Sequence, residues 1–98
     1  MYPFKVIWLV HGDDQAYPVK VLISVSKRTM KKAVQRNRIK RLMRESYRLQ
    51  KQELYEHLES DRKKLLLGII YTGREMISFD DARRKINRVL SRLLKEID

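Results

Sequence analysis

The chain has no cysteine and little proline or glycine, with two prolines and three glycines among 98 residues. Without cysteine, disulfides and thiolate metal sites are excluded, and a cytoplasmic location is expected. The scarcity of helix and strand breakers, with 43% hydrophobic residues, indicates one folded domain over residues 1–98 rather than a disordered basic tail. The longest apolar runs, residues 6–10 and 65–71, are too short to span a bilayer, so we expect no membrane association.

Acidic residues are also scarce. The chain has 12 Asp and Glu but 23 Lys and Arg, which gives a net charge of +11. Residues 27–48 carry +9 of this charge, since they hold one acid, Glu45, and ten basic residues. The ten are Lys27, Arg28, Lys31, Lys32, Arg36, Arg38, Lys40, Arg41, Arg44 and Arg48. Such concentration on one segment indicates a docking site for a polyanion, with an ordinary solvated basic surface as the alternative.

Hydrophobic periodicity predicts an α+β fold in the order strand, strand, helix, strand, helix. The predicted elements are strands at 4–10, 19–25 and 65–72, a helix from Lys31 or Ala33 to about Ser60, and a helix from Phe79 to Ile97. We expect the first two strands to form an antiparallel hairpin with a loop at 11–18, and the third strand to be buried on both faces. Ser78 and Asp81 have the spacing of a capping box before the last helix.

The basic helix is predicted to have two faces. Ile39, Leu42, Met43 and Tyr47 fall on the core side, and Asn37, Arg41, Arg44 and Arg48 fall on the other. The second set forms a stripe that we expect to lack opposite charges. Guanidinium groups grip phosphates bidentately, Asn37 adds a donor and an acceptor for a sugar or base edge, and the amides near residues 31–36 add a phosphate site at the start of the helix.

Candidates for catalysis are few. His11 falls in a turn and His57 on a charged helix face, where ordinary surface histidines are expected. The sequence has no nucleophile elbow, phosphate-binding glycine loop or His-Glu-x-x-His motif, so we predict no catalytic and no metal-binding residues.

An aromatic residue on the first strand is a second candidate for contact with nucleic acid. Phe4, Val6 and Trp8 share one face of that strand, where Trp8 is either a core residue, which we favour, or a stacking platform for single-stranded nucleic acid. DNA binding through Asn37 and Arg41 is a weaker alternative, because no second helix closely precedes them.

Three motifs in succession resemble the signature of the bacterial ribonuclease P protein subunit. They are Ser24-Val-Ser-Lys27, Ala33-Val-Gln-Arg-Asn-Arg-Ile-Lys-Arg41 and Arg44-Glu-Ser-Tyr-Arg48. The resemblance implies a small mixed sheet with a left-handed crossover, like domain 2 of ribosomal protein S5. It also implies a bacterial cytoplasmic protein that binds ribonuclease P RNA and precursor tRNA, with no obligate protein partner. The RNA would hydrolyse the phosphodiester with magnesium and release the 5′ leader, while the protein alone binds no cofactor.

The resemblance also assigns roles to residues. Arg36, Asn37, Arg38, Lys40, Arg41 and Arg44 match the helix that contacts the catalytic RNA. Trp8 matches an aromatic position of the cleft for the leader, which would also include Phe4, Ser24, Ser26 and Lys27.

Two departures from the family pattern accompany the resemblance. Family members usually have an N-terminal helix that forms one cleft wall, whereas this sequence begins at the first predicted strand, so either the sequence is truncated or the protein lacks that helix. Thr29–Lys32 stands where many members have a glycine before the basic helix. A structural, ribosomal-type RNA-binding protein with no role in cleavage is the alternative function.

Overall fold

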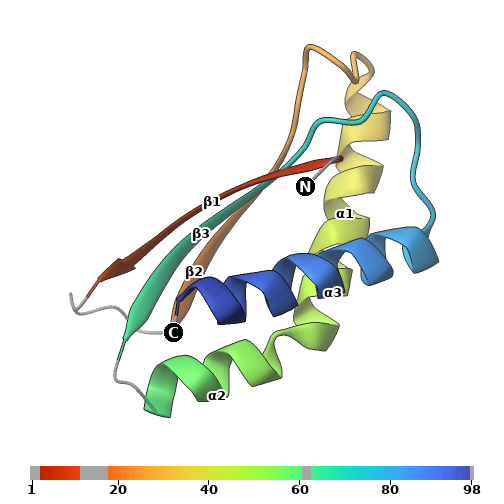
Figure 1. The fold of residues 1–98 in the computed structure, drawn as a ribbon. Helices are drawn as coiled ribbons and strands as arrows, with labels where there is room; N and C mark the ends of the chain where they lie inside the picture. Colours follow the sequence, from red (N-terminus) through yellow and green to blue (C-terminus); the bar gives the residue numbers. More distant parts are fainter. Residues whose placement is uncertain (1–2, 12–17, 61–62, 98) are drawn as a thin grey trace.

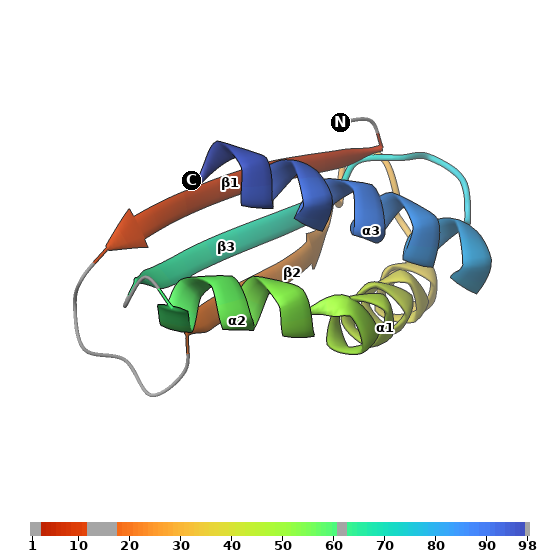
Figure 2. The same ribbon diagram turned by 60° about the horizontal axis from the view of Figure 1, so that its bottom comes forward.

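The computed structural model describes residues 3–11, 18–60 and 63–97. The elements in chain order are β1 (Phe4–His11), β2 (Val19–Val25), α1 (Ala33–Gln50), α2 (Gln52–Ser60), β3 (Lys64–Tyr71) and α3 (Phe79–Glu96). They form one layer of strands and one layer of helices (Figures 1 and 2). The predicted α+β class and the positions of the three strands are confirmed.

The sheet has the order β1-β3-β2, so the predicted hairpin of β1 and β2 is wrong. β3 lies between them, antiparallel to β1 and parallel to β2. A parallel pair requires a long crossover, which α1 and α2 provide, and this connection brings the most apolar strand into the centre. The handedness of this crossover stays a prediction. Residues 12–17 of the predicted loop lie outside the described residues.

The helices cover one face of the sheet and leave the other open (Figure 2). β3 therefore alternates, with Leu65, Leu67 and Ile69 buried and Leu66 38% exposed. The prediction that this strand is buried on both faces is wrong, because no described helix covers its second face. That face is nevertheless apolar, with exposed side chains at Ile7, Leu9, Leu22 and Leu66.

The long helix predicted to Ser60 is two helices that meet at Lys51. A straight helix over residues 33–60 would be about 42 Å long at 1.5 Å per residue, whereas the longest dimension of the molecule is 40 Å. The break turns α2 back toward β3 and α3, where Leu54 and Leu58 are buried. The apolar positions of α2 thus reach the core only because the helix is interrupted.

α3 follows the prediction closely. The Ser78 hydroxyl accepts a hydrogen bond from the amide of Asp81 at 3.1 Å, which confirms the N-cap, and both Asp80 and Asp81 lie in the first turn where the helix dipole favours them. Ala82, Ile86 and Leu93 point into the core. Among the described residues, no helix combines the length and apolar character needed to cross a bilayer.

Candidate nucleic-acid interface

The two predicted faces of α1 are confirmed. Ile39, Met43 and Tyr47 are buried against β2 and α3, with Leu42 packed at their margin. Burial raises the pKa of the Tyr47 hydroxyl far above its ordinary range, so this phenol stays neutral. Because the core anchors one side of α1, the orientation of its polar side is fixed.

The polar side of α1 and the turn before it form one surface. We call it the α1 basic surface, and it consists of Lys27, Arg28, Lys31, Lys32, Asn37, Arg38, Lys40, Arg41 and Arg44. These residues are exposed except for Lys40, which is half-buried. Within the described parts of the chain, none of these cations forms an ion pair with an acid.

The start of α1 adds unpaired backbone donors to this surface. The N-cap residue, Lys32, makes no side-chain capping bond, and the first turn contains no acidic residue. The amides of a first helical turn lack intrahelical partners and carry the positive end of the helix dipole. These features favour an anion beside Lys31 and Lys32, and the phosphate site predicted there stays a prediction.

Arg36 stabilises the turn before α1 through hydrogen bonds within the chain, and this sets it apart from the other residues predicted to bind RNA. One of its guanidinium nitrogens, Nη1, donates to the carbonyl oxygens of Met30 at 3.0 Å and Lys31 at 2.7 Å. Met30 is itself buried and its amide donates to the carbonyl of Ser26 at 3.0 Å. Arg36 thus positions the basic turn, and Arg36 is less available to a ligand than a free side chain.

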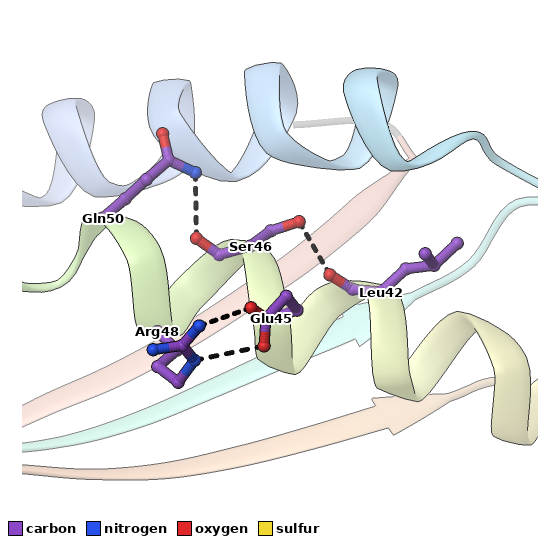
Figure 3. Close-up of polar contacts among 5 residues, drawn as sticks. All are labelled: Leu42, Glu45, Ser46, Arg48 and Gln50. Carbon is purple, nitrogen blue, oxygen red and sulfur yellow. Dashed lines mark hydrogen bonds and ion pairs between the residues drawn. The ribbon is translucent and has the colours of Figure 1, made fainter.

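Arg48 is neutralised, so the prediction of a stripe without opposite charges is wrong at this residue. Arg48 Nε donates to one carboxylate oxygen of Glu45 at 3.1 Å and its Nη2 to the other at 2.5 Å (Figure 3). The hydrogen bond from Arg48 holds the pKa of Glu45 below its ordinary value. The free charge of the helix is consequently concentrated toward its first three turns.

A polar contact that the sequence did not predict joins α1 to α3. Gln50 Nε2 donates to the carbonyl oxygen of Arg83 at 2.9 Å. It also donates to the carbonyl of Ser46 at 3.0 Å, and the buried Ser46 hydroxyl donates to the carbonyl of Leu42 at 2.7 Å (Figure 3). The one available signal was the small Ser46 among large core residues, which permits close helix packing. Nothing in the sequence identified Arg83 as the partner.

The residues predicted for the leader cleft are separated by the sheet. Phe4 is buried and packs edge to face on Tyr71, so it belongs to the core. Trp8 is 37% exposed and is in register with the buried Leu67, which places it on the helix-covered face. Ser24 is in register with Ile70 on the open face.

Trp8 lines a pocket between β1 and the end of α3. The pocket is also lined by Val6, Val89, Arg92, Leu93 and Glu96. Ser26 and Lys27 instead follow β2, close in sequence to the basic turn. Lys27 therefore belongs to the α1 basic surface and Ser26 directly precedes it, whereas Phe4 and Trp8 lie elsewhere.

Comparison with known proteins identifies the family. The family model described as Ribonuclease P matches residues 2–94, a span that includes both the α1 basic surface and the sheet. The chain belongs to the ribonuclease P protein family.

Several relatives bear the name ribonuclease P protein component. That of Porphyromonas gingivalis (strain ATCC 33277) is 31% identical over 93 residues, which cover 95% of this chain and 68% of the relative. That of Chlorobaculum tepidum is 42% identical over 83 residues, covering 79% of this chain and 54% of the relative. That of Chlorobium phaeobacteroides is 39% identical over 79 residues, covering 74% and 54%. No solved structure gives a significant match.

Membership of the ribonuclease P family gives the chain the role of a ribonuclease P subunit and confirms the resemblance seen in the sequence. Within that family assignment, the geometry of α1 distinguishes cations that have no ion pair among the described residues from Arg36 and Arg48, which have partners within the chain.

Proposed function

We propose that this chain binds the catalytic RNA of ribonuclease P through the α1 basic surface and promotes removal of the 5′ leader from precursor tRNA. The observation that carries the proposal is the exposure of cations that form no ion pair among the described residues, on a helix whose opposite side is fixed in the core. Rigid guanidinium groups on one surface suit a phosphate backbone, because each can bind phosphate oxygens bidentately.

The chemistry in this proposal belongs to the RNA. The α1 basic surface offers donors and positive charge, whereas a magnesium ion requires oxygen ligands. We therefore assign magnesium binding to the RNA and its substrate. The role of this chain in the proposal is to bind RNA and to reduce the electrostatic repulsion between phosphate backbones that lie close together at its surface.

For the leader we propose contact near the end of β2. Ser24 lies on the open face of the sheet, and Ser26 and Lys27 continue from β2 toward α1. A single strand that follows this path would pass from the open face to the basic turn. Trp8 lies on the other face, so a contact there requires a separate nucleotide pocket.

Salt dependence of RNA binding tests the proposal. The probe is a transcript of ribonuclease P RNA from P. gingivalis, titrated with the chain in 50 to 200 mM KCl. If about 6 to 10 phosphates are neutralised, affinity falls roughly 10³ to 10⁵ fold over this range. The double substitution Arg41→Ala and Arg44→Ala should reduce the slope by about two.

A matched control removes the same charge elsewhere. Lys20→Ala with Arg74→Ala takes two exposed cations from the open sheet face and the segment after β3. This control should keep the wild-type slope. A flat salt dependence of the unmodified chain, or equal slopes for the two double variants, would contradict the assignment of α1.

A further inference from the structure

The outward side of α3 carries a second group of cations. Its core side holds Ala82, Ile86 and Leu93, and the other side holds Arg83, Arg84, Arg88, Arg92 and Lys95. The net charge of the sequence did not reveal this group of cations on α3. Outside residues 27–48 the net charge is only +2, because 11 Asp and Glu offset 13 Lys and Arg, six of which lie in α3.

Ion pairs divide the cations of α3 into two kinds. Arg84 pairs with Asp81 one turn earlier, and Arg92 pairs with Glu96 at 3.3 Å. Within the described residues, Arg83 and Arg88 have no acidic partner. Their charge is therefore available to a ligand.

These two free arginines line one hollow between the end of α1 and the first half of α3. We call this hollow the α3 basic surface, and it is lined by Gln50, Asp80, Arg83, Arg84, Asn87 and Arg88. Asp80 is the single acid among the six, so the hollow is positive. Asn87 contributes an exposed amide with both donor and acceptor atoms.

The hollow is held in a fixed shape. Gln50 uses both hydrogens of its amide nitrogen on the carbonyls of Ser46 and Arg83, and these bonds join the two helices that form the walls. Its amide oxygen, which can accept a hydrogen bond, points away from the bond to Ser46 (Figure 3). A phosphate beside a sugar hydroxyl matches this combination of guanidinium donors and an amide acceptor.

We propose that the α3 basic surface binds the phosphate backbone of a second segment of the same ribonuclease P RNA that docks on α1. The inference rests on the proposed function. α1 and α3 pack against one another in the helical layer, so one large folded RNA can reach both, whereas the open face of the sheet lies on the other side (Figures 1 and 2). The protein would then clamp two RNA segments.

The test compares three double variants of the chain in binding to the P. gingivalis ribonuclease P RNA transcript. They are Arg83→Ala with Arg88→Ala, Arg41→Ala with Arg44→Ala, and the control Lys20→Ala with Arg74→Ala. Alanine preserves helix propensity, and the Gln50 bond survives because it uses the backbone of Arg83. We expect the α3 variant to lose about tenfold or more in affinity at 150 mM KCl and about two in salt slope.

The outcomes separate the two proposals. If the α1 variant weakens binding and the α3 variant behaves like the control, the inference on α3 is overturned while the proposed function stands. If neither variant weakens binding, the proposed function fails and this inference fails with it. A second arm uses precursor tRNA alone, and loss of binding there but not to the ribonuclease P RNA would overturn the choice of RNA.

Discussion

Gln50 at the end of α1 donates to the carbonyl oxygen of Arg83 in α3 at 2.9 Å, and so joins the helix of the proposed RNA site to the last helix of the chain. The same amide nitrogen donates to Ser46 at 3.0 Å. Replacing Gln50 by Ala removes both bonds. We expect the free energy of unfolding to fall by about 1 to 2 kcal/mol in urea denaturation.

The control for this prediction is Gln52→Ala. Gln52 is exposed, and among the described residues its side chain bonds to Glu56 one turn along α2, so the unfolding free energy should change by less than about 0.5 kcal/mol. Equal losses for the two variants would mean that the contact between α1 and α3 does not stabilise the fold.

Arg36 and Arg38 are two residues apart and should behave differently. Arg36→Ala removes the bonds to Met30 and Lys31 that hold the basic turn, so it should reduce the unfolding free energy by about 1 to 2 kcal/mol. Arg38 is exposed and free of ion pairs among the described residues. Arg38→Ala should leave stability within about 0.5 kcal/mol of wild type and lower the salt slope of RNA binding by about one.

Urea denaturation and RNA titration of both variants check this division. Arg36→Lys should be little more stable than Arg36→Ala, because an ammonium group cannot reproduce the geometry of the guanidinium that contacts both carbonyls. If Arg36→Ala unfolds at the wild-type urea concentration, Arg36 has no positioning role.

Glu45 limits the charge that α1 presents. Glu45→Gln removes the acid that pairs with Arg48, so Arg48 becomes available and the salt slope of binding to ribonuclease P RNA should rise by about one. Because Arg48 holds the pKa of Glu45 low, acidification frees Arg48 only below the ordinary carboxylate range. Glu53→Gln, on α2, is the matched control, and an equal rise there would indicate a general charge effect.

The burial of Leu58 depends on the break between α1 and α2, so substitution of this residue tests the break. Leu58 is fully buried, whereas Leu49 on α1 is 46% exposed. Leu58→Ala should cost about 2 to 5 kcal/mol of unfolding free energy, and Leu49→Ala a small fraction of that. Similar costs for the two substitutions would be expected if the helix ran straight to Ser60 and left Leu58 in solvent.

Much of the local structure could be predicted from the sequence. The alternation of Val19, Val21, Ile23 and Val25 and the helical phase of 79–97 report burial directly, and both predictions are confirmed. The exposed side of α1 was predicted for the same reason. Each of these features depends on a hydrophobic periodicity that is visible within a single segment of the sequence.

The packing of strands and helices that are distant in the sequence could not be predicted from such local patterns. The apolar run at 64–71 is compatible with a strand covered on both faces, and only the placement of all helices on one side shows that Leu66 is exposed. The strand order depends on where the crossover ends, which no local pattern records. The pairing of Arg48 with Glu45 and the role of Arg36 depend on side-chain geometry that charge counting treats as uniform.

Cleavage of precursor tRNA by ribonuclease P RNA tests the central claim most directly. The rate is measured at low magnesium with no protein, with this chain, and with the Arg41→Ala and Arg44→Ala double variant. We predict that the chain accelerates release of the 5′ leader and that the double variant loses most of this effect while retaining its fold. No acceleration by the chain, or full acceleration by the double variant, would contradict the account.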